Sequence, residues 1–171
     1  MSVMRRLFLL RHAEADRPAN TPDHLRPLTQ RGMQDALAMG GYMAQEGLLP
    51  QLAVVSTATR TRGTWEQVQK QLPGLVPAIF ESRVYECQAA DILNVIRATA
   101  PEHHSLMVVG HNPGMQTLAL RLVGHAVRNA FSRLGHDFPP GALAVVDFEL
   151  AGWNDIADHG GTLERFATPS D

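Results

Sequence analysis

Two arginines and two histidines stand at or shortly after the ends of short apolar segments, where their side chains could act together. They are Arg11, His12, Arg60 and His111. The apolar segments are residues 7–10, 52–55 and 106–109, and such continuous runs are typical of strands buried on both faces. Ligands of open, mostly parallel sheets bind outside the carboxyl ends of the strands. We therefore expect the four side chains to meet at one edge of a sheet.

The chemistry that suits this set of side chains is phosphoryl transfer. A guanidinium presents a rigid fork of donors that binds a phosphate group through two hydrogen bonds. A neutral imidazole can attack phosphorus and carry the group covalently, and nearby arginines favour the neutral form by lowering the histidine pKa. A second histidine, if protonated, would donate to the charge that develops on the phosphoryl oxygens. This chemistry requires no metal ion and no cofactor.

The rest of the pattern predicts the elements that position these residues. Thr29 is an expected N-cap of a helix that ends at Gly47, and the adjacent pair Gly40-Gly41 weakens the prediction that this helix is continuous. Further helices are expected at 58–72, 89–100 and 115–123, an extended segment at 76–85, a strand at 142–150 and an edge strand at 162–166. Apolar runs that alternate with amphipathic helices predict an α/β domain with a largely parallel central sheet.

Length and composition exclude several classes of protein. The chain has 171 residues, 44% of them hydrophobic, and a formal net charge of −2, which predicts a single folded domain over residues 1–171. Near-neutral charge gives no general reason to bind nucleic acid or an anionic membrane, so any anion site must be local. The apolar run Leu7–Leu10 is too short for a signal peptide or a membrane span. The single cysteine, Cys87, fits a reducing compartment, and we expect a cytoplasmic protein.

Three segments resemble, in order, the motifs of the histidine phosphatase superfamily. The stretch Leu9–Glu14 resembles its R-H-G/A signature, Ser56–Thr64 its S-x-A-x-R-x-x-x-T segment, and Val108–Pro113 its V-x-G-H-x-P block. The similarity extends from Leu7 to about Val123. It implies a phosphoglycerate-mutase-like fold, which is a three-layer α/β sandwich with a mostly parallel central sheet.

Within that superfamily, the short chain, the element Arg26–Gly32 and the segment Val84–Glu86 are similar to the small bacterial phosphohistidine phosphatases of the SixA type. The resemblance implies that His12 is the phosphorylated nucleophile and that two arginines, Arg11 and Arg60, bind the phosphoryl group. It also implies that His111 stabilises the group during transfer. Arg26 is either a further substrate-binding residue or an ordinary surface charge.

Glu86 bears on the choice of substrate. Larger members of the superfamily protonate the leaving oxygen with an acidic residue in an insertion for which this chain has little room, and Glu86 is the best-placed candidate for that acid. An alkoxide needs such a proton, whereas an imidazole, with a pKa near 6.5, needs much less help. The expected activity is therefore hydrolysis of phosphohistidine on a phosphorelay or phosphotransfer protein. The alternatives are a phosphatase of small phosphate esters, which would need Glu86, and a non-catalytic phosphate-binding module.

Overall fold

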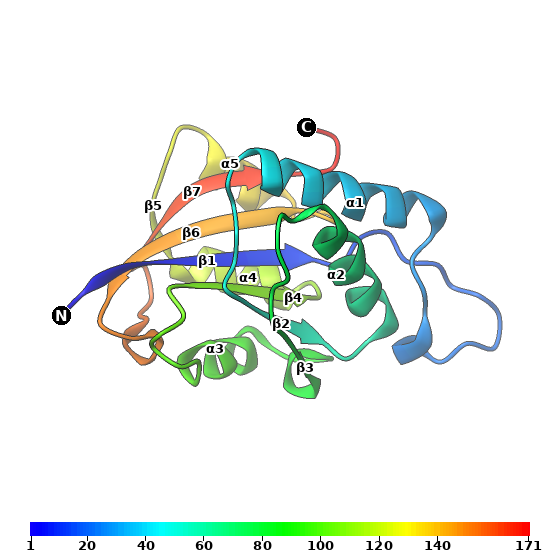
Figure 1. Cartoon of the computed structure of the whole chain (residues 1–171), viewed down its shortest axis with the longest axis horizontal. Helices are drawn as coiled ribbons and strands as arrows, with labels where there is room; N and C mark the ends of the chain where they lie inside the picture. The colour runs from blue at the N-terminus through cyan, green and yellow to red at the C-terminus, as the bar shows by residue number, and fades with distance from the viewer.

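The computed structural model describes residues 1–171, and a seven-stranded sheet runs through its middle (Figure 1). The strands are β1 (Val3–Arg11), β2 (Leu52–Ser56), β3 (Ala78–Glu81), β4 (Ser105–Gly110), β5 (Val123–Ala126), β6 (Leu143–Leu150) and β7 (Gly161–Ala167). Their order across the sheet is β3-β2-β4-β1-β6-β7-β5, and only β6 runs antiparallel to its neighbours. The prediction of a mostly parallel sheet is confirmed.

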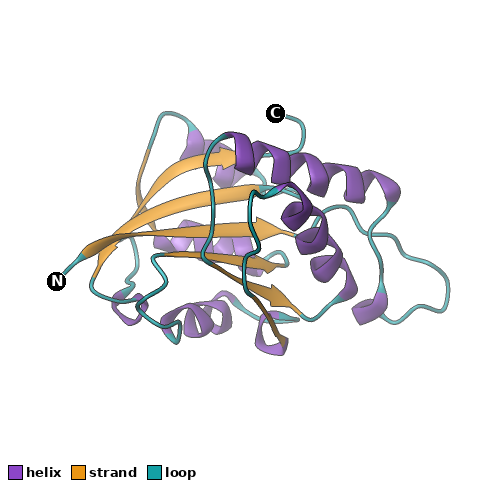
Figure 2. Cartoon of the chain, in the orientation of Figure 1, coloured by secondary structure: helices purple, strands orange, loops and turns teal.

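Helices cover both faces of this sheet, as Figure 2 shows. The helices are α1 (Gln30–Gln45), α2 (Thr59–Gln71), α3 (Ala89–Arg97), α4 (Gly114–Leu122) and α5 (Ala130–His136). Side chains of α1 and α2 pack with Phe8 and Leu10 of β1 in one hydrophobic cluster, and side chains of α3, α4 and α5 pack with Leu7 and Leu9 in another. The molecule is thus the three-layer sandwich that the family resemblance implies, and β1 is apolar at successive positions because both of its faces are covered.

Helix α1 is continuous, although the sequence made its middle doubtful. Thr29 caps it as predicted, since its hydroxyl accepts a hydrogen bond from the Gly32 backbone N–H at 3.0 Å. Gly40 is needed for packing, because a Cβ there would lie 2.6 Å from the Val68 carbonyl oxygen of α2. The glycine therefore lets the two helices approach closely, and this packing outweighs its low helix propensity.

The chain between α4 and β6 and the far edge of the sheet differ from the prediction. The strand expected at an edge, β7, lies between β6 and β5, and the short strand β5 forms the edge instead. Helix α5 was not predicted. The segment expected to be extended at 76–85 contains β3 and then a 3₁₀ turn, Ser82–Val84. None of the helices combines the length and the hydropathy that a membrane-crossing segment needs.

Candidate active site

The sheet brings three strand ends together at the site. Strands β2, β4 and β1 are consecutive and parallel, so their carboxyl ends lie at one edge. Arg11 ends β1 directly beside Gly110 of β4, and His12 and His111 follow these two residues. The two imidazole centroids are 5.2 Å apart. Arg60 reaches the same place from the first turn of α2, which starts three residues after β2.

His12 is buried in a defined orientation. Its Nδ1 lies 2.7 Å from the Ala13 carbonyl oxygen, and because a carbonyl can only accept, Nδ1 carries the proton and Nε2 keeps its lone pair. Burial lowers the pKa of His12 to about 4, the bond to Ala13 opposes that effect, and Arg11 and Arg60 add to it. His12 is therefore a neutral imidazole at neutral pH, with Nε2 available as a nucleophile.

The backbone around His12 is fixed by bonds to three other elements. The His12 N–H donates to Gly110 of β4 at 3.0 Å, and the His12 carbonyl accepts from Gly141 at 3.0 Å. The Thr64 hydroxyl of α2 accepts from the Ala13 N–H at 3.0 Å and donates to the Arg60 carbonyl at 2.8 Å. One buried hydroxyl thus connects the loop after β1 to the turn of α2 that carries Arg60.

Both arginines are held from the protein side, with Arg60 buried and Arg11 half-buried. Arg11 donates from Nη1 to the Phe138 carbonyl at 2.9 Å. Arg60, whose side chain is only 8% exposed, donates from Nη1 to the Asp23 carbonyl at 2.8 Å and from Nη2 to the Asp23 carboxylate at 3.1 Å. Each guanidinium is therefore fixed by its terminal nitrogens, and each leaves its Nε unused.

His111 is also uncharged at neutral pH. Its Nε2 lies 2.8 Å from the Ser56 hydroxyl of β2. Burial, and next the neighbouring His12 and Arg60, together lower the pKa of His111 to about 3. The sequence left open a protonated second histidine, whereas the structure favours a neutral one, which can still donate one hydrogen bond.

Three buried side-chain nitrogens make no hydrogen bond within the protein. They are Arg11 Nε, Arg60 Nε and His111 Nδ1. All three belong to residues that the sequence predicted for the site. A buried donor without a partner costs about 1–3 kcal/mol, so groups left in this state indicate a place for a ligand. Oxygen atoms of an anion would satisfy the two guanidinium N–H groups.

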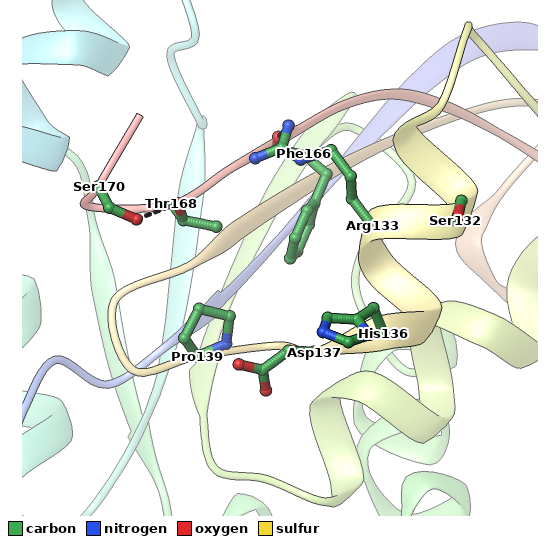
Figure 3. Close-up of a pocket in the computed structure, with 8 residues that line it drawn as sticks. All are labelled: Ser132, Arg133, His136, Asp137, Pro139, Phe166, Thr168 and Ser170. Atoms are coloured by element: carbon green, nitrogen blue, oxygen red, sulfur yellow. Dashed lines mark hydrogen bonds between the residues drawn. The ribbon is translucent and has the colours of Figure 1, made fainter.

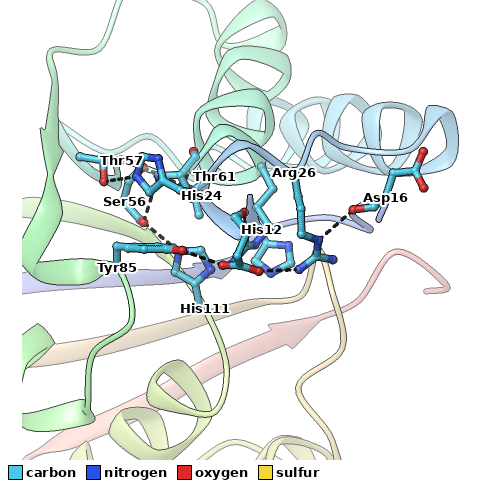
Figure 4. Close-up of polar contacts among 12 residues, drawn as sticks. His12, Asp16, His24, Arg26, Ser56, Thr57, Thr61, Tyr85 and His111 are labelled. Carbon is cyan, nitrogen blue, oxygen red and sulfur yellow. Dashed lines mark hydrogen bonds and ion pairs between the residues drawn. The ribbon is translucent and has the colours of Figure 1, made fainter. Parts of the chain in front are cut away.

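A second layer of polar groups, not predicted as functional from the sequence, surrounds these residues (Figure 4). The Tyr85 hydroxyl donates to the Asp23 carboxylate at 2.7 Å, and His24 Nε2 lies 2.8 Å from the Thr57 hydroxyl. Tyr85 meets His111 and His24 edge to face, with centroid distances of 5.6 and 4.6 Å. Asp23 and His24 belong to a 3₁₀ turn (Asp23–Leu25) in the proline-marked loop. The only signal for this layer was the proximity of these residues to the family motifs.

Arg26 and Glu86 take different positions relative to the centre. Arg26 contributes to lowering the pKa of His12, donates from Nε to the Asp16 carbonyl at 2.9 Å, and pairs with the Asp23 carboxylate at 3.1 Å. It therefore belongs to the polar layer. Glu86 is exposed, in a left-handed backbone conformation with φ 47°, and it contributes to raising the pKa of Tyr85, after burial and Asp23. The structure thus brings Glu86 beside the Tyr85 hydroxyl at the rim.

A cavity of about 400 Å³ is lined by residues of α5, β7 and the segments that follow them (Figure 3), and none of the predicted site residues lines it. Its lining includes Asp137 and Pro139, which flank the Phe138 carbonyl that holds Arg11. The structure contains no cluster of three or more His, Cys, Asp or Glu side chains that could hold a metal ion.

Comparisons with known proteins agree with this geometry. A family model described as "Histidine phosphatase superfamily (branch 1)" matches residues 7–92. An uncharacterized chloroplastic protein of Arabidopsis thaliana is 34% identical over 137 residues, covering 74% of this chain, and the match spans 63% of the plant protein.

Two solved structures share the whole fold. A protein named "putative phosphohistidine phosphatase SixA" from Nakamurella multipartitia is 29% identical, with a TM-score of 0.83 over 99% of this chain and 98% of that one. A protein of the same name from Agrobacterium tumefaciens is 28% identical, with a TM-score of 0.82 over 96% of this chain and 98% of that one.

Proposed function

Since the chain belongs to the histidine phosphatase superfamily (branch 1), we propose that this phosphatase hydrolyses phosphohistidine on a partner protein through a covalent intermediate at His12. The observation that carries the proposal is the set of three unpartnered buried nitrogens beside the free Nε2 of His12. The names of the two similar SixA structures support the choice of phosphohistidine.

In the first step, the lone pair of His12 Nε2 attacks phosphorus. The P–N bond to the substrate imidazole breaks, its electron pair returns to the substrate nitrogen, and that nitrogen takes up a proton from solvent. In the second step, water attacks phosphorus, the P–Nε2 bond breaks, and inorganic phosphate leaves while the proton of the water passes to solvent. The bond from Nδ1 to Ala13 keeps the same tautomer of His12 ready for each cycle.

The arginines and His111 act on the phosphoryl oxygens. The unused Nε groups of Arg11 and Arg60 would donate to these oxygens and stabilise the charge that spreads over them during transfer. When the Ser56 hydroxyl donates to His111 Nε2, the neutral imidazole carries its proton on Nδ1, the nitrogen without a partner, and this N–H becomes a third donor. These charges and donors supply, without a metal ion, the electrostatic stabilisation that the reaction needs.

Phosphohistidine is favoured over a sugar phosphate by the leaving group. An imidazole with a pKa near 6.5 departs with little help, whereas an alkoxide requires a proton from a general acid. Glu86 is the candidate acid, and it is exposed at the rim rather than held in the centre. A small-ester phosphatase would depend on this carboxyl group, and a phosphohistidine phosphatase would not.

The test is a labelling experiment followed by a comparison of substrates. After brief mixing with a ³²P-phosphohistidine protein, acid-labile and base-stable label should appear on the chain and be absent from His12→Ala. His104→Ala removes an exposed histidine just before β4, at the opposite end of that strand, and should label normally. Turnover of the same protein is then compared with that of a panel of sugar phosphates. Label on another residue would refute the mechanism, and faster turnover of a sugar phosphate would refute the substrate.

A further inference from the structure

Asp23 occupies the part of Arg60 that is best suited to bind phosphate. Both terminal nitrogens of the Arg60 guanidinium donate to Asp23, one to its carbonyl and one to its carboxylate. The same carboxylate pairs with Arg26 and accepts from the Tyr85 hydroxyl. The Asp23 carboxylate therefore lies against the guanidinium of Arg60, a residue proposed to bind the phosphoryl group.

These contacts are easily exchanged for others. The Asp23 side chain is 44% exposed, and the 3₁₀ turn that carries it has no buried residue. Arg60 is buried, but solvent partly screens an ion pair to a half-exposed carboxylate, and a segment with few buried contacts opens at low cost. The Tyr85 hydroxyl and the two arginines hold the pKa of Asp23 well below its usual range, so the carboxylate stays negative wherever the enzyme is folded and active.

We propose that Asp23 is an internal counter-anion that competes with phosphate for Arg60 and thereby promotes release of the product. The inference rests on the proposed function insofar as it takes the product to be inorganic phosphate at this site. A phosphorylated substrate brings two negative charges, reaches Arg11 and His111, and gains further contacts from the protein that carries it. Free phosphate lacks the contacts that the partner protein makes. The same competing charge therefore removes a larger share of the binding free energy of the product than of the substrate.

The test measures phosphate binding directly, so that it does not depend on turnover. Asp23→Asn removes the charge but keeps a side-chain oxygen that can accept from Arg60 and Tyr85. Calorimetric titration with inorganic phosphate at low ionic strength should show about three- to tenfold tighter binding to this variant than to the wild type, the size expected of a half-exposed charge interaction. The difference should shrink in high salt because salt screens exposed charges.

Asp16→Asn is the matched control. It makes the same change of charge in the same loop, and the Asp16 carboxylate accepts only from the Arg17 backbone N–H. Its affinity for phosphate should stay within twofold of wild type, about the scatter expected of a surface change.

Two outcomes would overturn the inference. Unchanged affinity in Asp23→Asn would show that the carboxylate does not compete, and weaker binding would show that it only positions Arg60. Tighter phosphate binding in Asp23→Asn, together with no label on His12 of the wild-type chain, would instead refute the proposed function. The competition of Asp23 with phosphate for Arg60 would then still hold.

Discussion

Replacing Thr64 by valine tests the link between the nucleophile loop and helix α2. Thr64 is fully buried, and its hydroxyl is the only partner of the Ala13 N–H. Valine keeps the shape but leaves that N–H buried and unsatisfied, at a cost of about 1–3 kcal/mol. The carbonyl of the same Ala13 orients His12, so a shift of this loop misplaces the proposed nucleophile, and kcat/KM should fall by roughly tenfold to a hundredfold.

Thr64→Ser separates the hydroxyl from the methyl group. Serine keeps the hydrogen bonds and loses one buried methyl, worth about 1 kcal/mol. Both variants should therefore be less stable in urea unfolding, but only the valine variant should lose most of its kcat/KM. Equal loss of activity in the two variants, or a valine variant with wild-type kcat/KM, would show that the hydroxyl does not position His12.

Four further outcomes follow from the site. The pKa of His12 is about 4 in the folded chain and 6.5 in the unfolded chain, so the unfolded chain binds more protons between these pH values. The free energy of unfolding, measured in urea titrations, should therefore fall as the pH is lowered from 6.5 to 4. His12→Asn should make that fall shallower. Arg11→Lys and Arg60→Lys keep the charge and lose the fork, so kcat/KM should drop by well over tenfold; near-wild-type rates in both would contradict the proposed clamp. Glu86→Gln should cost little with a phosphohistidine protein and roughly 10²–10⁴-fold with an alkyl phosphate if Glu86 is the acid; a large loss with phosphohistidine would contradict the leaving-group argument. Activity should survive exhaustive chelation, and restoration by a divalent ion after loss would indicate a metal-dependent reaction.

The strand ends of the site could be predicted from the sequence because the signals there are local. A run such as Leu7–Leu10 marks a doubly covered strand by itself, and the rule for carboxyl ends then brings Arg11, His12 and His111 together. The two neighbouring layers of helices follow from the same alternation of apolar runs and helices.

The polar layer could not be predicted because its contacts join residues that are far apart in sequence. Asp23 and Tyr85 are separated by 62 positions and lie in or beside 3₁₀ turns, which have no hydrophobic periodicity. The edge strand β5 has four residues, two of them exposed, and its pairing with β7 contains an irregularity. Its sequence therefore has no hydrophobic pattern that would predict a strand. The doubt that Gly40 raised about the continuity of α1 is removed by a tertiary contact, the close approach of α2.

The central place of β1 has a consequence for how the enzyme acquires its activity during synthesis. Strand β1 precedes in the chain both of its neighbours in the sheet, β4 and β6, whose pairing residues begin at Ser105 and Leu143. The apolar faces of β1 therefore stay uncovered until most of the chain has been synthesised, and contacts of such long sequence separation slow folding. Since His12 directly follows this strand, the proposed nucleophile is oriented only when the sheet has closed around β1.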